Sequence, residues 1–131
     1  MASIFSRIMA GEIPCHPIAE NDEFFAFLDI NPVATGHVLV VPKQEIDYIF
    51  DIDDDALGRM MAFAKRVARA QKAAIPCKRI GLTVMGLEVP HAHIHLAPIT
   101  QESDLCFSKN KLTPSQEELA VTAGKIRNEY K

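Results

Sequence analysis

The chain has 131 residues, of which 48% are hydrophobic and 24% are charged, and its formal net charge is −3. This length and balance are typical of one soluble globular domain, which we expect to span residues 1–131. The slight acidity argues against a DNA or RNA partner, which a basic patch would indicate. No run approaches the ~20 apolar residues of a membrane span, and the three scattered cysteines fit a reducing compartment. We therefore expect a cytoplasmic protein without a membrane partner.

A short helix is expected near the N-terminus, from Ser3 to Ala10, with Ser3 as its N-cap and Gly11 at its end. Its apolar residues share one side at helical spacing, and they are Ile4, Phe5 and Ile8. That side either docks the helix on the body of the protein or forms one wall of a ligand pocket.

Three strands are expected next. A weak candidate covers residues 15–19 and a stronger one covers 24–28, and the polar turn between them favours a hairpin. The third covers 37–42. Asp29 follows the second strand, where binding residues are common, although a lone acid before a turn more often belongs to the turn itself. His37 begins the third strand, and its importance depends on which residues lie beside it in space.

The middle of the chain predicts a long helix. The acidic run at 51–55 supplies its N-cap and first-turn acids, and Pro76 closes it. Its buried stripe consists of Leu57, Met60, Met61, Ala64, Val67, Ala68 and Gln71, of which only the last is polar. We interpret the methionines as core residues rather than as a cofactor site.

The last third predicts a strand at 79–84, a histidine-rich strand, a loop at 99–112 and a helix at about 113–131. We expect a capping box from Thr113 to Gln116 at the start of this helix, with Pro114 at its first position. Its expected buried residues are Leu119, Ala123, Ile126 and Tyr130. Consecutive strands joined by short turns predict an antiparallel sheet, and hence an α+β fold with the long helix on one face.

The stretch Pro-His-Ala-His-Ile-His-Leu-Ala-Pro at 90–98 alternates strictly, which favours a strand over a helix. On a strand His91, His93 and His95 would form one row. The opposite row would face the core and consists of Ala92, Ile94 and Leu96. Other polar residues solvate a sheet face equally well, so three aligned imidazoles, which titrate near neutral pH, indicate chemistry.

Three such imidazoles allow two chemistries. They can hold a metal ion, but neighbours in one row lie roughly 6.5–7 Å apart, so the outer two share an ion poorly. Alternatively, His93 attacks a phosphorus centre with a neutral imidazole lone pair. His91 and His95 would then hydrogen-bond the non-bridging oxygens and stabilise the developing charge.

Three segments resemble the histidine triad (HIT) family. PHAHIHLAP resembles its His-x-His-x-His signature, IFSRIMAGEIP its N-terminal segment, and FFAFLDINPVATGHVLVVPK its Asp-Ile-x-Pro turn and the strand after it. The Hint-like branch is the most similar. The resemblance implies an α+β protomer that forms a homodimer by pairing sheets across a two-fold axis. It also implies binding of a purine nucleotide and hydrolysis or transfer at the α-phosphate through a nucleotidyl-histidine intermediate, without a metal or cofactor.

The resemblance also implies roles for individual residues. The catalytic positions are His93 as nucleophile, His91 and His95 on either side of it, and the upstream His37. Asp29 matches the acid that binds the ribose hydroxyls. The apolar walls of the base pocket match Phe5, Ile8, Phe27 and Ile30, and the residues leading into the triad, Leu87, Glu88 and Val89, complete the nucleotide site.

The sequence departs from the family at several of its polar contacts. Leu87 replaces a glutamine that contacts the phosphate or leaving group, and the Asn-x-Gly loop before it is shortened to residues 83–85. Glu45 replaces a further histidine, and Ser6 replaces the zinc-ligand cysteine of some bacterial members, so structural zinc is not expected. These changes leave an alternative open, a nucleotide-binding regulatory module with weak or no catalysis.

Overall fold

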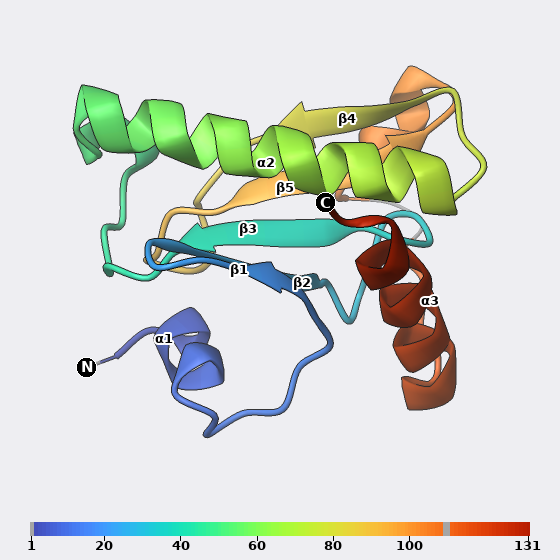
Figure 1. The fold of residues 1–131 in the computed structure, drawn as a ribbon, viewed down its shortest axis with the longest axis horizontal. Helices are drawn as coiled ribbons and strands as arrows, with labels where there is room; N and C mark the ends of the chain where they lie inside the picture. The colour runs from blue at the N-terminus through green and yellow to red at the C-terminus, as the bar shows by residue number, and fades with distance from the viewer. Residues whose placement is uncertain (1, 109–110) are drawn as a thin grey trace.

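The computed structural model describes residues 2–108 and 111–131, and it has the expected α+β architecture (Figure 1). Five strands form an antiparallel sheet in the order β1-β2-β3-β5-β4. The strands are β1 Pro17–Glu20, β2 Phe24–Leu28, β3 Val38–Pro42, β4 Arg79–Thr83 and β5 Ile94–Ile99. The helices are α1 Ile4–Met9, α2 Asp54–Ala74 and α3 Gln116–Glu129, with short 3₁₀ helices η1 Ile49–Asp51 and η2 Glu102–Leu105.

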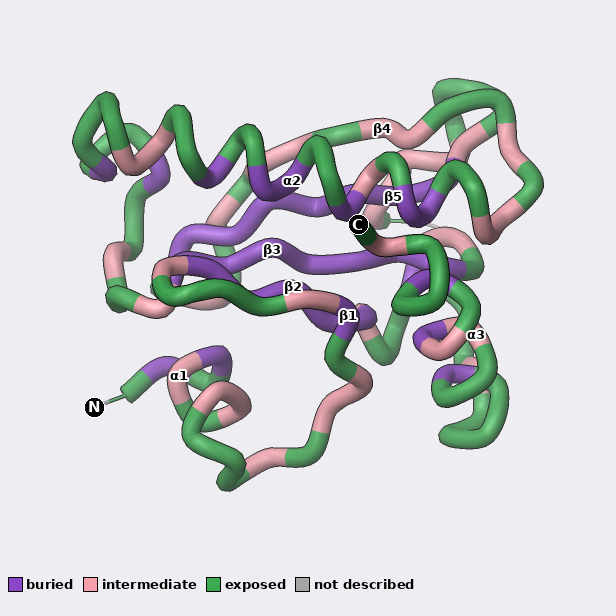
Figure 2. Tube along the Cα trace, viewed as in Figure 1, coloured by how far each residue is buried: buried purple, intermediate pink, exposed green. Residues whose placement is uncertain are grey.

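Both faces of the central strands are covered, as the buried colouring of β2, β3 and β5 in Figure 2 shows. One face packs against α2 and α3 in a core that includes Ile94 and Leu96 of β5. On the opposite face, Phe5 of α1 packs against a smaller cluster of side chains from β2 and β3. In Figure 1, α1 and α2 accordingly lie on opposite sides of these strands. The predicted core-facing row of the histidine segment is therefore confirmed.

Helix α2 forms where its caps and stripe predict. Asp53 is its N-cap and accepts the Ala56 N–H at 2.9 Å. The one polar residue of the stripe, Gln71, is fully buried and bridges the loop before β3 and strand β5. Its Nε2 donates to the carbonyl oxygens of Gly36 at 2.8 Å and Leu96 at 2.9 Å. Because Gly36 precedes His37 and Leu96 follows His95, this side chain fixes the relative position of the two histidines.

Several expected element boundaries are wrong. Strand β1 covers Pro17–Glu20 instead of residues 15–19, and the expected loop at 99–112 contains the 3₁₀ helix η2. Strand β5 begins at Ile94, so His91 and His93 precede the strand instead of belonging to it. The chain bends there because the N–H of His91 donates to the Val89 carbonyl oxygen and that of Ala92 donates to the Ile46 carbonyl oxygen, outside the sheet ladder.

The start of α3 lies two residues later than expected. Its N-cap is Ser115, whose hydroxyl accepts the Glu118 N–H while the Glu118 carboxylate accepts the Ser115 N–H. A carboxylate is a stronger acceptor than the amide of Gln116, which favours this box over the one that Thr113 would form. In the part of the chain that the structure describes, no helix is long and apolar enough to cross a bilayer.

Candidate functional site

The pairing of β3 with β5 brings the histidines together although they come from distant parts of the chain. Leu39 of β3 lies opposite His95 of β5, which places His37, two residues before Leu39, on the same face. The ring centroids of His37 and His95 are 5.2 Å apart, and those of His93 and His95 are 4.8 Å apart. Three imidazoles therefore lie in a continuous row, and all three are buried.

The hydrogen bond from His93 determines which of its ring nitrogens can react. Nδ1 of His93 lies 2.8 Å from the carbonyl oxygen of His91, and a carbonyl oxygen only accepts hydrogen bonds. Nδ1 therefore carries the proton, and in the neutral ring Nε2 carries the lone pair. Burial lowers the pKa of His93 below its usual value, which keeps the ring neutral at pH 7. The result is an imidazole with a nucleophilic Nε2.

A second chain of hydrogen bonds fixes His37 and His95. The Val33 N–H donates to Nδ1 of His37 at 3.2 Å, so the proton of the neutral His37 ring is on Nε2. That Nε2–H donates to Nδ1 of His95 at 3.0 Å. His95 therefore carries its own proton on Nε2. Burial lowers the pKa of His37 to about 4, with a smaller contribution from the charge of Lys111. Burial also lowers the pKa of His95 to about 3, with smaller contributions from His37 and His93. Both rings are neutral at pH 7.

His91 is oriented away from this row and uses both ring nitrogens within the protein. Nε2 donates to the carbonyl oxygen of Pro42 at 2.7 Å, so Nδ1 accepts from the hydroxyl of Ser3 at 2.6 Å. The Ser3 backbone N–H in turn donates to the Glu45 carboxylate at 2.6 Å. The expected contact between His91 and a phosphate oxygen would break one of these bonds. The structure instead places His91 behind the site, where its carbonyl orients His93.

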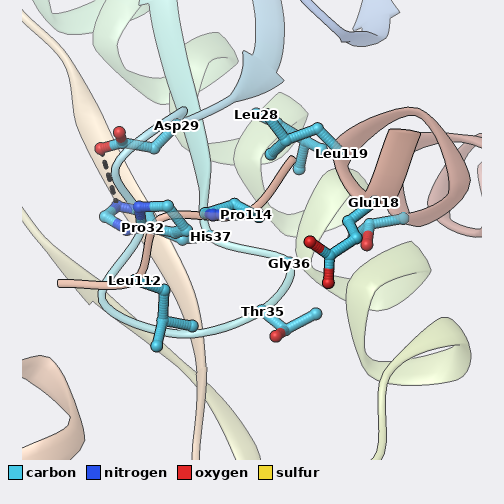
Figure 3. Close-up of a pocket in the computed structure, with 11 residues that line it drawn as sticks. Leu28, Asp29, Pro32, Thr35, Gly36, His37, Leu112, Pro114, Glu118 and Leu119 are labelled. Atoms are coloured by element: carbon cyan, nitrogen blue, oxygen red, sulfur yellow. Dashed lines mark ion pairs between the residues drawn. The ribbon is translucent and has the colours of Figure 1, made fainter. Parts of the chain in front are cut away.

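Asp29 lies at the edge of the histidine row. Its Oδ1 accepts the Asn31 N–H at 2.8 Å, as in an Asx turn, and its Oδ2 lies 3.8 Å from Nε2 of His37, the contact dashed in Figure 3. Because His37 is neutral at pH 7, this contact is not an ion pair there. Burial raises the pKa of Asp29, although the Asn31 N–H opposes the shift. The charge of Lys111 also opposes the shift, but burial is the larger effect.

A cavity of about 90 Å³ borders Asp29 and His37 (Figure 3). It lies between the loop that precedes β3 and the segment that leads into α3, and Thr35, Leu112 and Glu118 are among its lining residues. This volume accommodates a few water molecules but not a nucleotide. A nucleotide would therefore have to lie on the exposed side of the histidine row.

The other expected nucleotide-site residues differ in their exposure. Phe5 contacts the rings of Phe27, His91 and His93 with centroid separations of 5.6, 5.6 and 5.0 Å. Phe5 and Phe27 are buried, whereas Ile30 is 53% exposed. Ile8 and Val89 are half-buried beside the same apolar cluster, and Leu87 is 91% exposed. Glu88 is exposed, and its charge is one of the lesser influences on the pKa of His93.

Sequence reasoning missed two residues after β5. The ring of Phe107 stacks on His37 at 5.7 Å with an interplanar angle of 8°, and it contacts His95 at 4.5 Å. The charge of Lys111 acts on Asp29, His37 and His95. The only sequence signal for this role was the presence of an aromatic residue and a lysine in a segment expected to be a loop. Which residues they contact depends on the tertiary structure.

Only one group of His, Cys, Asp and Glu side chains in the described residues has the spacing of a metal site. It consists of Asp29, His37 and His95. Otherwise the row offers one imidazole lone pair, on His93, next to one imidazole N–H donor, on His95. This combination suits displacement at an electrophilic centre whose departing or non-bridging atoms become negatively charged.

Comparison with known proteins gives a consistent result. The family model described as HIT domain matches residues 10–102. The adenosine 5'-monophosphoramidase HNT1 of Saccharomyces cerevisiae is 38% identical over 102 residues, which cover 77% of this chain and 65% of the yeast protein. An uncharacterized HIT-like protein of Borreliella burgdorferi is 32% identical over 83% of this chain and 84% of its own length. A crystal structure of a Hit-like protein from Bartonella henselae superimposes with a TM-score of 0.85 at 30% identity, covering 97% of this chain and 95% of the other.

Proposed function

The chain belongs to the HIT family, and from this premise we propose that it is a nucleotide hydrolase or transferase. The proposed reaction occurs at the α-phosphate of a purine nucleotide derivative, such as a nucleoside phosphoramidate or a dinucleoside polyphosphate. It proceeds through a nucleotidyl-histidine intermediate and uses protein groups without a metal. The similarity to a yeast adenosine 5'-monophosphoramidase supports the phosphoramidate class.

The observation that carries this proposal is the fixed proton on Nδ1 of His93. Nε2 of His93 attacks the α-phosphorus, a P–N bond forms, and the bond to the leaving group breaks with its electron pair. The Nε2–H of His95 donates to an oxygen or to the departing atom while negative charge develops there. The phosphorylated ring is cationic, and the His91 carbonyl oxygen stabilises its Nδ1–H. Water then attacks phosphorus and releases the nucleotide and neutral His93.

The nucleotide side of the proposal uses the residues next to the histidine row. We assign the ribose hydroxyls to the Asp29 carboxylate, whose Oδ2 receives no N–H donor from its own turn. The purine would lie along the apolar side formed by Ile8 and Ile30, with buried Phe5 and Phe27 as the support beneath it.

The test is a His93→Gly variant, with His16→Gln as the control because the ring of His16 hydrogen-bonds Gln116 of α3 instead of another histidine. Both proteins are incubated with purine phosphoramidates and dinucleoside polyphosphates, and products and trapped nucleotidyl-protein are followed by mass spectrometry. The control should turn over substrate and His93→Gly should not, although it should still bind AMP or GMP by calorimetry. Full turnover by His93→Gly would refute the assignment.

A second candidate is a nucleotide-binding regulatory module, which the exposed Leu87 favours. Leu87 is 91% exposed, and its side chain has no polar atom that could contact a leaving group. Leu87→Gln should then raise kcat at least several-fold. An unchanged kcat in that variant would count against this alternative.

We also propose that two copies associate through strand β4, one of the two edge strands of the sheet. Strand β4 pairs only with β5 among the described residues, and Leu82 in β4 is 44% exposed. An unpaired edge with an exposed leucine readily adds a further strand. Pairing of β4 with its two-fold copy would join the two sheets.

A further inference from the structure

We propose that Asp29, His37 and His95 form a binding site for a divalent transition-metal ion of the zinc class, and that the bound ion inhibits the enzyme. The inhibitory half of this inference rests on the proposed function, whereas the binding half does not. The metal ion would lie between the rings of His37 and His95 and the carboxylate of Asp29.

The three donor atoms already lie close to a coordination geometry. All of them are within 4.8 Å of one another. Nε2 of His37 is 3.0 Å from Nδ1 of His95 and 3.8 Å from Oδ2 of Asp29. Ligands about 2.0–2.1 Å from a tetrahedral zinc ion are separated by roughly 3.3 Å. The two nitrogens would therefore separate slightly and the carboxylate would move toward them, which side-chain rotation can provide.

The donor set selects the type of cation. Two imidazoles and one carboxylate suit zinc, copper, nickel or iron, whereas magnesium and calcium prefer an all-oxygen shell. His37 and His95 are buried, and a metal ion binds only the neutral form of imidazole. The hydrogen bond between Nε2 of His37 and Nδ1 of His95 already turns both donor atoms toward each other.

Binding requires one proton to move. The proton on Nε2 of His37 moves to Nδ1 of the same ring by exchange through water, so the ring stays neutral and both facing nitrogens present lone pairs to the metal. On Nδ1 it displaces the N–H of Val33, whose hydrogen bond of 3.2 Å is long and correspondingly weak. The rearrangement therefore costs one long hydrogen bond.

Space for the remaining ligand is present. The cavity of about 90 Å³ borders Asp29 and His37, which leaves room for a coordinated water molecule. The ring of Phe107 covers the faces of His37 and His95. Such an apolar cover limits access of bulk water and strengthens the electrostatic attraction between ion and ligands.

The expected consequence is competition with nucleotide. The ion occupies the carboxylate that we assign to the ribose, and it holds the ring of His95 through Nδ1, so that ring cannot adjust to the substrate. A metal-bound protein should therefore bind AMP more weakly and should not turn over substrate. Mg²⁺ should have neither effect.

The binding test uses full-length protein stripped with chelator and titrated with Co²⁺, whose visible absorption reports tetrahedral coordination. We expect one ion per chain and no thiolate-to-cobalt charge-transfer band. Asp29→Asn retains the Oδ1 acceptor for the Asn31 N–H, and it should weaken Co²⁺ binding by about tenfold or more. His16→Gln should bind as tightly as the wild type. Unchanged affinity in Asp29→Asn, or a thiolate band, would overturn the site.

The inhibition test adds Zn²⁺ to turnover assays and follows recovery after chelator is added. Inhibition should be competitive with AMP-type substrate and reversible, and Mg²⁺ at the same concentration should leave the rate unchanged. Protein that binds Co²⁺ at Asp29 but turns over none of the substrates would refute the proposed function and leave the metal site standing. Full turnover in saturating Zn²⁺ would refute the inhibition.

Discussion

The hydroxyl of Ser3 lies 2.6 Å from Nδ1 of His91, and this contact joins the N-cap of α1 to the residue whose carbonyl orients His93. Ser3 also caps its helix by accepting the Ser6 N–H at 3.0 Å. One buried side chain thus holds both the helix that carries Phe5 and the backbone beside the proposed nucleophile.

Ser3→Ala should lower the free energy of unfolding by about 2–3 kcal/mol, because it removes a helix cap and leaves a buried ring nitrogen without its donor. It should also lower kcat, since His91 loses a constraint on its position. Urea denaturation and steady-state kinetics measure the two effects. Ser6→Ala is the matched control, because its hydroxyl bonds the exposed Glu45 and its loss should cost less than about 0.5 kcal/mol. Equal stability losses in the two variants would contradict the role of Ser3.

Acidification should destabilise the protein between pH 6.5 and 4. The pKa of His37 is about 4 and that of His95 about 3 in the folded state, so the unfolded chain binds their protons first as the pH falls through 6.5. Each ring should remove about 2 kcal/mol of stability by pH 5, at roughly 1.4 kcal/mol per pH unit. Asp29, with a raised pKa, acts in the opposite direction at the acid end.

Urea unfolding at several pH values between 5 and 8 measures this slope. His37→Gln should reduce the slope by about one proton, and His16→Gln should leave it as in the wild type. A free energy of unfolding that is constant from pH 7 to 5 would contradict the buried neutral state of the pair.

Phe107→Ala should lower kcat/KM about fivefold, the equivalent of an aromatic contact of roughly 1 kcal/mol. Removing the ring admits water to His95, so the pKa of His95 should rise toward its ordinary value. A pH–rate profile and an NMR titration of the ring measure these effects. Ser108→Ala changes the exposed neighbour and should alter neither. A Phe107→Ala profile identical to that of the wild type would remove Phe107 from the site.

Leu82→Asp should convert the proposed dimer to a monomer, because it places a charge at the free edge of β4. Light scattering coupled to size-exclusion chromatography gives the mass directly. Val121→Asp changes a residue of similar exposure on α3 and should leave the dimer intact. A wild-type protein that is already monomeric at micromolar concentration would refute the edge-pairing model.

Much of the fold was predictable because its local signals are strong. The strand at 24–28 and the helix cap at Ser3 have the predicted bounds and role, and α2 begins within the acidic run, which supplies its N-cap and first-turn acids as predicted. The start of β5 was not predictable, since strict alternation continues through His91 while the backbone bonds outside the sheet. The two overlapping capping boxes before α3 likewise differ only in the strength of their acceptors.

The candidate site was less accessible to sequence reasoning. The repeated spacing of histidines singled out the segment, but the partner of His95 is decided by the register of β3 on β5. That register explains why His37 faces His95. His91 instead contacts Ser3 because it precedes the strand, where the backbone bonds outside the sheet. The tautomers depend on single backbone groups of Val33 and His91, which carry no sequence signature.

Gln71 adds a consequence of another kind. Its single amide nitrogen binds the carbonyl before His37 and the carbonyl after His95, from a helix on the far side of the sheet from the histidine row. The length of the hydrogen bond between His37 and His95 is therefore influenced by α2, a helix remote from the proposed substrate. Substitutions along α2 can lengthen or shorten that distance. Evolution can therefore change the proton affinity of His37 and His95 without altering any residue that contacts the nucleotide.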